Sequence, residues 1–182
     1  MANNCFYDMK ITGRKEAISE LIQMLKWKGK YENSGLGRTY SCCIIEGITE
    51  IEGDIGYAVV CGDCAWSVYT AMMDYHGREH SLESETERLG LIVEVYSSEP
   101  GIGFQEHILI DKGVIEFNDC VDYEEHWVED YASIEEYNEE NDTDFTEDMV
   151  DDNGNVCVGG FGGDYGCFQS FDAVDFNYKK GE

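Results

Sequence analysis

Two adjoining stretches near the N-terminus predict the first two elements of the fold: residues 5–12, CFYDMKIT, and residues 14–29, RKEAISELIQMLKWKG. The first stretch alternates apolar and polar side chains with a period of two, which predicts a half-buried β-strand. The second stretch changes to helical spacing and ends on a glycine, the residue that most often follows a helix. Its apolar stripe consists of Ile18, Leu21, Ile22 and Leu25. The chain therefore begins with a strand followed by an amphipathic helix.

Further along the chain, apolar runs and turn residues mark more strands and a second helix. Strands are predicted over residues 39–51, 54–61, 89–96, 104–110 and 114–123, and a helix after residues 62–63. Residues 76–87 are polar and are predicted as a loop, either with or without a further short helix. The first six elements follow the order β-α-β-β-α-β, which is that of a ferredoxin-like split βαβ unit. The sequence therefore predicts an α+β protein. We expect a ferredoxin-like core, an antiparallel sheet with two helices, extended by additional antiparallel strands.

The composition changes after residue 123. Residues 124–182 are acidic and rich in aromatic residues and glycine, and we expect them to form an extension that packs on the domain formed by residues 1–123. In this extension Trp127, Tyr131 and Ile134 follow helical spacing, which predicts a short acidic amphipathic helix. Residues 167–176 are aromatic enough to pack back on the body of the protein.

The charge is strongly negative and unevenly distributed. Thirty-nine acidic residues stand against twelve Lys and Arg, which gives a net charge of −27. Seven of the twelve basic residues lie between Lys10 and Arg38, and the 66 residues from Gly113 to Tyr178 contain none. Such a field repels duplex DNA and anionic membranes and attracts basic proteins. The alternative interpretation is that the charge only keeps the protein in solution.

The chain carries no sign of export or of a membrane span. No apolar run approaches the ~18 residues of a transmembrane helix. The opening residues, MANNC, have neither the basic nor the apolar region of a secretory signal. We therefore expect a soluble protein of the cytoplasm whose eight cysteines are mainly reduced thiols. The oligomeric state is not specified by the sequence.

One cysteine pair has the spacing of a reactive or metal-binding site. Cys61 and Cys64 form a Cys-x2-Cys motif at a predicted strand–helix junction, as in thioredoxin-like redox proteins. Together with His76 and His80 they give Cys-x2-Cys-x11-His-x3-His, which is close to a zinc-finger spacing. The strand and helix order already explains this segment, so the leading prediction is a protein without cofactor or metal. The zinc-stabilised protein and the redox protein remain alternatives.

The remaining histidines and the rest of the chain offer no catalytic constellation. His107 and His126 are most simply residues on the surface of a strand. No nucleophile and base can be paired from the sequence, so we do not predict an enzyme.

Three short motifs resemble a known family. The opening MANNC, the triplet Ala65-Trp66-Ser67 and the segment Glu99-Pro100-Gly101-Ile102-Gly103-Phe104 resemble the YubB-type ferredoxin-like family of phage and plasmid genomes. The resemblance covers roughly residues 1–131. The prolines that usually follow the Trp-Ser pair are replaced by Val68-Tyr69. The family has no catalytic residues to carry over, and the resemblance implies an accessory protein of a mobile genetic element.

Charge and resemblance together predict a non-enzymatic inhibitor that binds a basic nucleic-acid-handling protein of the bacterial host. Its carboxylates would stand in for DNA phosphates and its aromatic residues would supply buried contacts. The resemblance makes an anti-CRISPR protein acting on a Cas9-type RNA-guided nuclease the most concrete version. The alternative is a structural accessory protein without inhibitory role. The predicted partner-binding residues are Asp119, Asp122, Glu124, Glu125, Trp127, Glu129, Asp130, Tyr131, Glu135, Glu136, Glu139 and Glu140.

Overall fold

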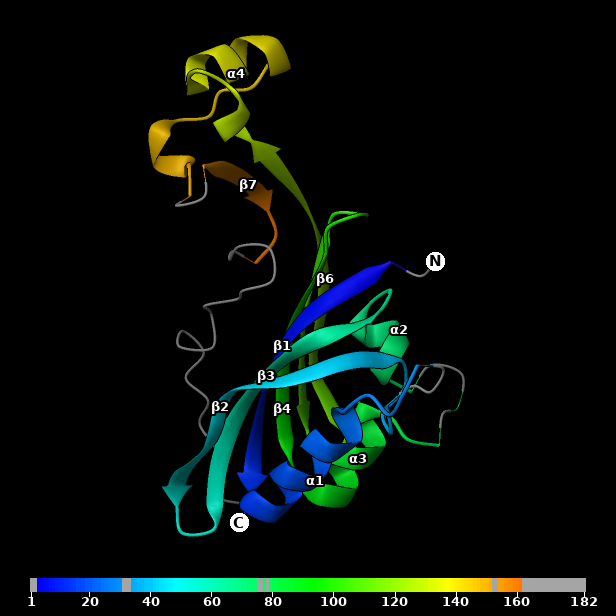
Figure 1. Cartoon of the computed structure of the whole chain (residues 1–182). Helices are drawn as coiled ribbons and strands as arrows, with labels where there is room; N and C mark the ends of the chain where they lie inside the picture. Colours follow the sequence, from blue (N-terminus) through cyan, green and yellow to red (C-terminus); the bar gives the residue numbers. More distant parts are fainter. Residues whose placement is uncertain (1–2, 31–33, 75–76, 78, 152–153, 162–182) are drawn as a thin grey trace.

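The computed structural model describes residues 3–30, 34–74, 77, 79–151 and 154–161. In it, strand β1 (Asn4–Arg14) lies inside a seven-stranded sheet (Figure 1). The strand order is β2-β3-β1-β4-β5-β6-β7, and every neighbouring pair is antiparallel. The other strands are β2 (Thr39–Glu52), β3 (Ile55–Ala65), β4 (Ile92–Glu99), β5 (Phe104–Asp111), β6 (Val114–Trp127) and β7 (Asn155–Gly159). The prediction of an α+β protein with an antiparallel sheet is confirmed.

The helices are short. The α-helices are α1 (Lys15–Leu25), α2 (Val68–Met72), α3 (Leu82–Leu89) and α4 (Ile134–Asn141), and two 3-10 helices are η1 (Val128–Asp130) and η2 (Glu147–Met149). Helices α1, α2 and α3 cover one face of the sheet (Figure 1). No helix in the described ranges has the length and apolarity needed to cross a bilayer.

The alternation of apolar and polar side chains in β1 determines which face of the sheet carries the hydrophobic core. Cys5, Tyr7, Met9 and Ile11 are buried against the stripe of α1 that contains Leu21. Fully burying such a side chain contributes about 1.5–3 kcal/mol, so this one face accounts for much of the hydrophobic stabilisation of the domain. The predicted strand–helix pair is therefore confirmed, together with its apolar buried face. The strand is not half-buried, however, because Asp8 and Thr12 on its other face are buried as well.

The region between β3 and β4 differs from the prediction. Strand β3 continues past Cys61 to Ala65, because its ladder with β1 extends to the pair Asn4↔Ala65. Two helices follow, α2 and then α3, and α3 begins within residues 76–87, where the sequence left open a loop with a short helix. The side chains of Ser67 and Ser81 each accept a hydrogen bond from a backbone N–H of the first turn, so each begins a separate helix.

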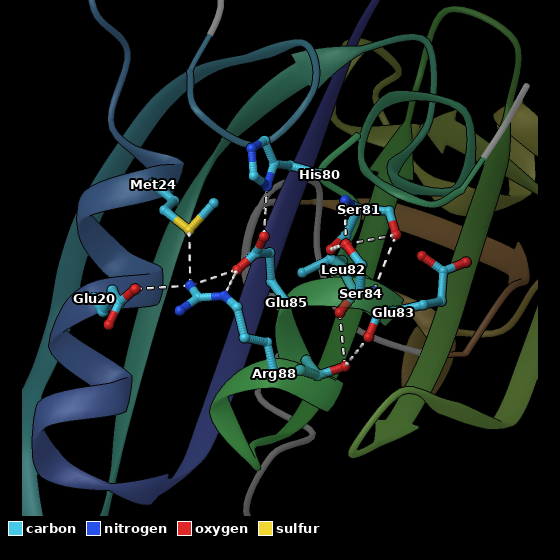
Figure 2. A network of polar contacts seen from close by, with 10 residues as sticks. Glu20, Met24, His80, Ser81, Leu82, Glu83, Ser84, Glu85 and Arg88 are labelled. Carbon is cyan, nitrogen blue, oxygen red and sulfur yellow. Dashed lines mark hydrogen bonds and ion pairs between the residues drawn. The ribbon is translucent and has the colours of Figure 1, made fainter. Parts of the chain in front are cut away.

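A polar network joins α3 to α1 (Figure 2). Arg88 Nε lies 2.7 Å from Glu85 Oε2, and Arg88 Nη2 lies 2.7 Å from Glu20 Oε1 of α1. His80 Nδ1 lies 2.6 Å from the other oxygen of Glu85, whose side chain is only 3% exposed. Burial raises the pKa of Glu85, but the hydrogen bonds from His80 and Arg88 outweigh burial and hold that pKa below its ordinary value. The ionised carboxylate therefore helps to fix α3 against α1.

The sheet face opposite the helices also carries buried groups. His107 Nε2 lies 2.8 Å from Glu94 Oε1, and the His107 ring stacks on Tyr96 at 4.0 Å between centroids. The backbone N–H of Phe161 donates to Gln105 Oε1 at 2.7 Å, and the Phe161 ring lies 5.8 Å from that of His107. The expectation that His107 is a surface residue is therefore wrong, because its side chain is only 17% exposed and a carboxylate and the rings of Tyr96, Phe117 and Phe161 surround it.

Strand β6 changes partner along its length. Its residues up to Asp122 pair with β5, and its last five, from Tyr123 to Trp127, pair with β7. The strand is continuous across residue 123, where the sequence predicted a boundary. The end of β6, α4 and β7 project from one end of the main sheet (Figure 1). We call residues 123–151 and 154–159 the acidic lobe. Residues 167–176, which were expected to pack on the body, lie outside the described residues.

Candidate partner-binding surface

The acidic lobe has a small hydrophobic core of its own. Val128, Ile134, Tyr137 and Val156 are buried in it, and the partly buried side chains of Tyr131, Phe145 and Val150 pack around them. His126 Nδ1 lies 2.7 Å from the Tyr137 hydroxyl, and the His126 ring also contacts that of Phe145 at 4.8 Å. These contacts fold the lobe around its own centre, separate from the main core.

Local hydrogen bonds define helix α4 and the loop after it. Ser133 Oγ accepts from the N–H of Glu136 at 3.3 Å, and Glu136 Oε2 accepts from the N–H of Ala132 at 3.0 Å. At the other end, Asp142 adopts a left-handed conformation with φ of 55°, the usual geometry of a helix C-terminus. The Asn138 side chain then bonds both the N–H and the carbonyl of Phe145. The carboxylates of α4 therefore project from a fixed backbone.

This helix begins later than the sequence predicted. The predicted helical stripe included Trp127 and Tyr131, but Trp127 is the last residue of β6 and pairs with Asn155 of β7. Tyr131 follows the short helix η1. The pairing with β7 holds the chain extended through Trp127, and the Ser133 cap starts the helix at Ile134. That part of the prediction is corrected.

Most of the predicted acidic residues are exposed to solvent. The exposed ones are Asp119, Asp122, Glu124, Glu129, Asp130, Glu135, Glu136, Glu139 and Glu140. Glu125 is half-buried and accepts a hydrogen bond from Asn155 Nδ2 at 3.3 Å. Backbone and Ser133 hydrogen bonds at the start of α4 lower the pKa of Glu135, which favours its ionised form. The lobe therefore presents a negatively charged surface.

Little positive charge balances this surface. The sequence between Gly113 and Tyr178 contains no Lys or Arg. His126 is the one histidine in this stretch, and its Nε2 lies 3.6 Å from Glu124 Oε2. A basic partner would thus meet carboxylates with few competing internal cations.

The predicted residues do not form one contiguous patch. Asp119 and Asp122 lie on the part of β6 that pairs with β5, opposite His107 and Phe104. Because side chains of a strand alternate between its faces, these two carboxylates point to opposite faces of the sheet. The carboxylates of α4 belong to the acidic lobe instead. The structure therefore separates Asp119 from the lobe residues. Asp122, by contrast, lies two residues before Glu124 on the same face of β6, and its carbonyl accepts a hydrogen bond from the N–H of Gly160 just after β7.

The two predicted aromatic residues have different environments. The Trp127 side chain is 53% exposed, and strand alternation places it on the face of β6 opposite His126 and the lobe core. Tyr131 instead packs edge-on against Tyr137, with 4.9 Å between ring centroids. Trp127 is therefore free to contact a partner, whereas Tyr131 helps to hold the lobe together.

Two exposed apolar residues of the lobe were not predicted as partner-binding residues from the sequence. Met149 of η2 is 44% exposed and Val158 of β7 is 40% exposed. Val158 pairs across the strands with Glu124. Their signal in the sequence is weak, because each is a single apolar residue in a polar or glycine-rich segment.

The Cys61–Cys64 pair does not form a common site. Both residues lie within β3, where the odd spacing puts their side chains on opposite faces of the sheet. Cys64 is buried opposite Cys5 on the helix-covered face, whereas Cys61 pairs with Asp8 and Cys43. The predicted strand–helix junction at this pair is wrong, and the two thiols cannot converge on one ion or one disulfide.

The histidines of the zinc alternative add little to that pair. His80 is engaged with Glu85, and His76 lies outside the described residues. Within the described ranges no group of three or more His, Cys, Asp or Glu side chains is placed to hold a metal ion.

Comparisons with protein-family models, with curated proteins and with solved protein structures found no match for this chain.

Proposed function

We propose that this chain is a non-enzymatic inhibitor that inserts its acidic lobe into the positively charged groove of a nucleic-acid-handling protein and so blocks DNA binding. The observation that carries the proposal is a projecting lobe with its own core in a stretch of 66 residues without Lys or Arg. A lobe that projects can contact both walls of a groove. Trp127 and α4 lie on opposite sides of β6, so each could contact a different wall of the groove.

Electrostatics favours such a complex. Proteins that hold DNA do so mainly through Lys and Arg contacts to phosphates, and carboxylates can satisfy the same side chains. Opposite fields also speed the encounter of the two proteins, in a way that falls with salt concentration. Because Ser133, Asn138 and the lobe core already order α4, binding costs less conformational entropy than binding by an unstructured acidic tail.

The core supports the proposed origin of the protein. The order β2-β3-β1-β4, with helices on one face, is the arrangement expected of a ferredoxin-like split βαβ unit. Such a core agrees with the resemblance of residues 65–67 and 99–104 to the YubB-type family of phages and plasmids. On this reading the protein acts in the cytoplasm of a bacterial host. An anti-CRISPR protein directed at an RNA-guided nuclease is the most concrete version.

A capture experiment with competing DNA tests the proposal. The full chain is immobilised and exposed to a nuclease-treated bacterial lysate and, separately, to a guide-loaded RNA-guided nuclease. The bait is used as wild type and as a variant with Glu135, Glu136, Glu139 and Glu140 changed to Gln. We expect the wild type to retain a basic DNA-binding protein that duplex DNA releases, and the variant to retain much less. Equal retention by both baits, or retention that duplex DNA does not affect, would overturn the proposal.

A further inference from the structure

A cavity of 420 Å³ lies in the core domain, away from the acidic lobe core. It opens where the first turn of α2 meets β5 and β6, and the residues that matter here are Trp66, Tyr69, Ile102, Phe104, Glu106 and Asn118. Cavities of about 300–1,000 Å³ with mostly apolar walls and a few convergent polar groups are typical of ligand sites. None of the residues that line the cavity belongs to the acidic lobe.

A buried carboxylate forms part of its wall. Glu106 is only 4% exposed, and its Oε2 accepts hydrogen bonds from Ser97 Oγ at 2.6 Å and from the N–H of Val68 at 2.7 Å. Its Oε1 accepts a longer bond, 3.3 Å, from the N–H of Tyr69. Burial holds the pKa of Glu106 above its ordinary value, and these donors offset only part of that rise. Among the described residues no Lys, Arg or His forms an ion pair with Glu106, so the carboxyl group has hydrogen-bond donors but no cation beside it, and a cation would favour its ionised form.

Aromatic side chains stand beside this carboxylate. Trp66 and Tyr69 line the cavity and are 39% and 40% exposed, so their rings are also accessible from outside. The guanidinium carbon of Arg38 lies 4.4 Å from the centroid of the Trp66 ring. The Trp66 ring therefore already takes one guanidinium group against its face, as expected for a cation–π contact.

The backbone holds Trp66 in an unfavourable conformation. Its φ is 66°, in the left-handed region that large side chains rarely adopt. Its N–H donates to the carbonyl of Asn3 at 2.9 Å, and this bond beside the β1–β3 ladder fixes the position. Strain of this kind concentrates at binding and catalytic sites, where the structure around it holds the residue in place.

Several carboxylates lie near the cavity. The neighbouring thiol of Cys120, which also lines the cavity, has its pKa raised first by burial and then by the charges of Glu106, Asp122 and Asp119. These carboxylates disfavour an anionic ligand and favour a cation that can pair with Glu106. Aromatic rings next to a carboxylate are the surroundings in which a guanidinium group binds best, since it can stack and donate paired hydrogen bonds at once.

We infer that this cavity binds the guanidinium group of an arginine side chain, which donates to Glu106 and stacks on the aromatic rings of Trp66 and Tyr69. The natural source of this group is an arginine exposed on a peptide or a partner protein. The inference does not depend on the function proposed for the acidic lobe, and its test uses no other macromolecule.

The test is a titration of the isotope-labelled full chain, followed by amide and indole NMR signals. The probe is N-acetyl-arginine amide, and the matched neutral probe is N-acetyl-citrulline amide, which keeps the shape and loses the charge. We expect saturable shifts at Trp66, Val68 and Tyr69 with the arginine probe. Citrulline should bind about tenfold more weakly or worse, as the loss of a charge-assisted hydrogen bond implies. Equal binding of both probes, or no saturable shift at these residues, would refute the inference.

Two variants and one control complete the test. Glu106→Gln should reduce the preference for arginine over citrulline to about threefold or less. The matched control is Glu116→Gln, which removes an exposed carboxylate of the neighbouring strand β6 and should leave the preference unchanged. Because the new amide group would face the backbone donors that Glu106 now satisfies, the first variant can fail to fold. Trp66→Gly is the second variant, since glycine relieves the positive φ while the ring is lost. It should fold and bind the arginine probe several-fold more weakly; unchanged binding would contradict the inference.

Discussion

The imidazole of His126 and the hydroxyl of Tyr137 lie 2.7 Å apart and connect the end of β6 to α4 in the centre of the acidic lobe. The two rings also meet edge-on, at 5.9 Å between centroids. Because a strand residue and a helix residue share this contact, it holds α4 at one position on the strand. The arrangement of the acidic side chains on α4 therefore depends on a few contacts within the lobe.

Removing the hydroxyl should loosen the lobe without affecting the main core. Tyr137→Phe leaves His126 Nδ1 without its partner, which costs about 0.5–1.5 kcal/mol for a hydrogen bond of this kind. We expect faster amide hydrogen exchange in residues 128–141 and unchanged exchange in β1. The control is Tyr40→Phe in β2. A uniform increase in exchange over the whole chain would show that the lobe does not have a core of its own.

Trp127 and Tyr131 should respond differently to truncation. Trp127→Ala removes an exposed side chain and should change the free energy of unfolding by about 1 kcal/mol or less. If Trp127 contacts the partner, the same change should speed dissociation, since a buried aromatic contact at an interface carries about 2 kcal/mol or more. Tyr131→Ala should instead destabilise the lobe. Melting curves and dissociation rates of both variants check this, and a Trp127→Ala protein that melts much earlier would contradict it.

The network around Glu85 makes a prediction about pH. The pKa of Glu85 is lowered in the folded chain, so the carboxylate stabilises the fold above its unfolded pKa of about 4.3, and this contribution is lost as the pH falls through the folded value. Arg88→Met should therefore lower the free energy of unfolding at pH 7 by about 1–2 kcal/mol, a modest amount because Arg88 is half exposed to water. The difference from wild type should shrink below pH 4.

Denaturant unfolding at several pH values measures this difference. Lys112→Met serves as the control, because Lys112 lies 3.9 Å from Asp111, a carboxylate that is far less buried than Glu85. A deficit of Arg88→Met that stays constant down to pH 3 would mean that lost packing, and not the charge of Glu85, explains its effect.

How far the sequence predicted this molecule depends on the distance between interacting residues. The alternation of residues 5–12 and the stripe around Leu21 are local patterns, and both elements were predicted with the correct buried face. The end of β3 was not, because Cys64 stays extended through its pairing with Cys5 in a distant strand. The start of α4 was predicted too early for the same reason, since β7 holds Trp127 extended.

The candidate sites show the same limit. The acidic composition of the lobe was visible in the sequence, but the placement of Asp119 on the face of β6 opposite Asp122 and Glu124 required the geometry of that strand. The cavity beside Glu106 was not predicted, because it brings the first turn of α2 to a carboxylate 38 residues further along the chain. No local spacing signals such a contact.

The protein should not bind duplex DNA. Its field is repulsive almost everywhere, and two cations of the basic N-terminal part are already paired: Arg14 with Asp54 at 3.1 Å and Lys15 with Glu50 at 2.6 Å. We expect no gel shift with low micromolar protein at physiological salt. A shift under these conditions would point to a contact between Lys10 and Arg38, and would contradict inhibition by DNA mimicry.

The salt dependence of partner association tests whether the acidic lobe guides binding. The rate of association with the captured basic protein is measured over a range of salt concentrations for three forms of the chain. The first is wild type, and the second carries Gln in place of Glu135, Glu136, Glu139 and Glu140. The third is a matched control in which the exposed carboxylates of the core are changed to Gln, namely Glu16, Glu79, Glu87 and Glu116.

Each variant loses four negative charges, so the two variants differ only in the position of the lost charges. If the acidic lobe guides the encounter, the lobe variant should associate more slowly at low salt and show a flatter salt dependence, while the core variant stays close to wild type. If the lobe variant keeps the wild-type rate at low and high salt, or if both variants slow equally, DNA mimicry by this lobe is wrong.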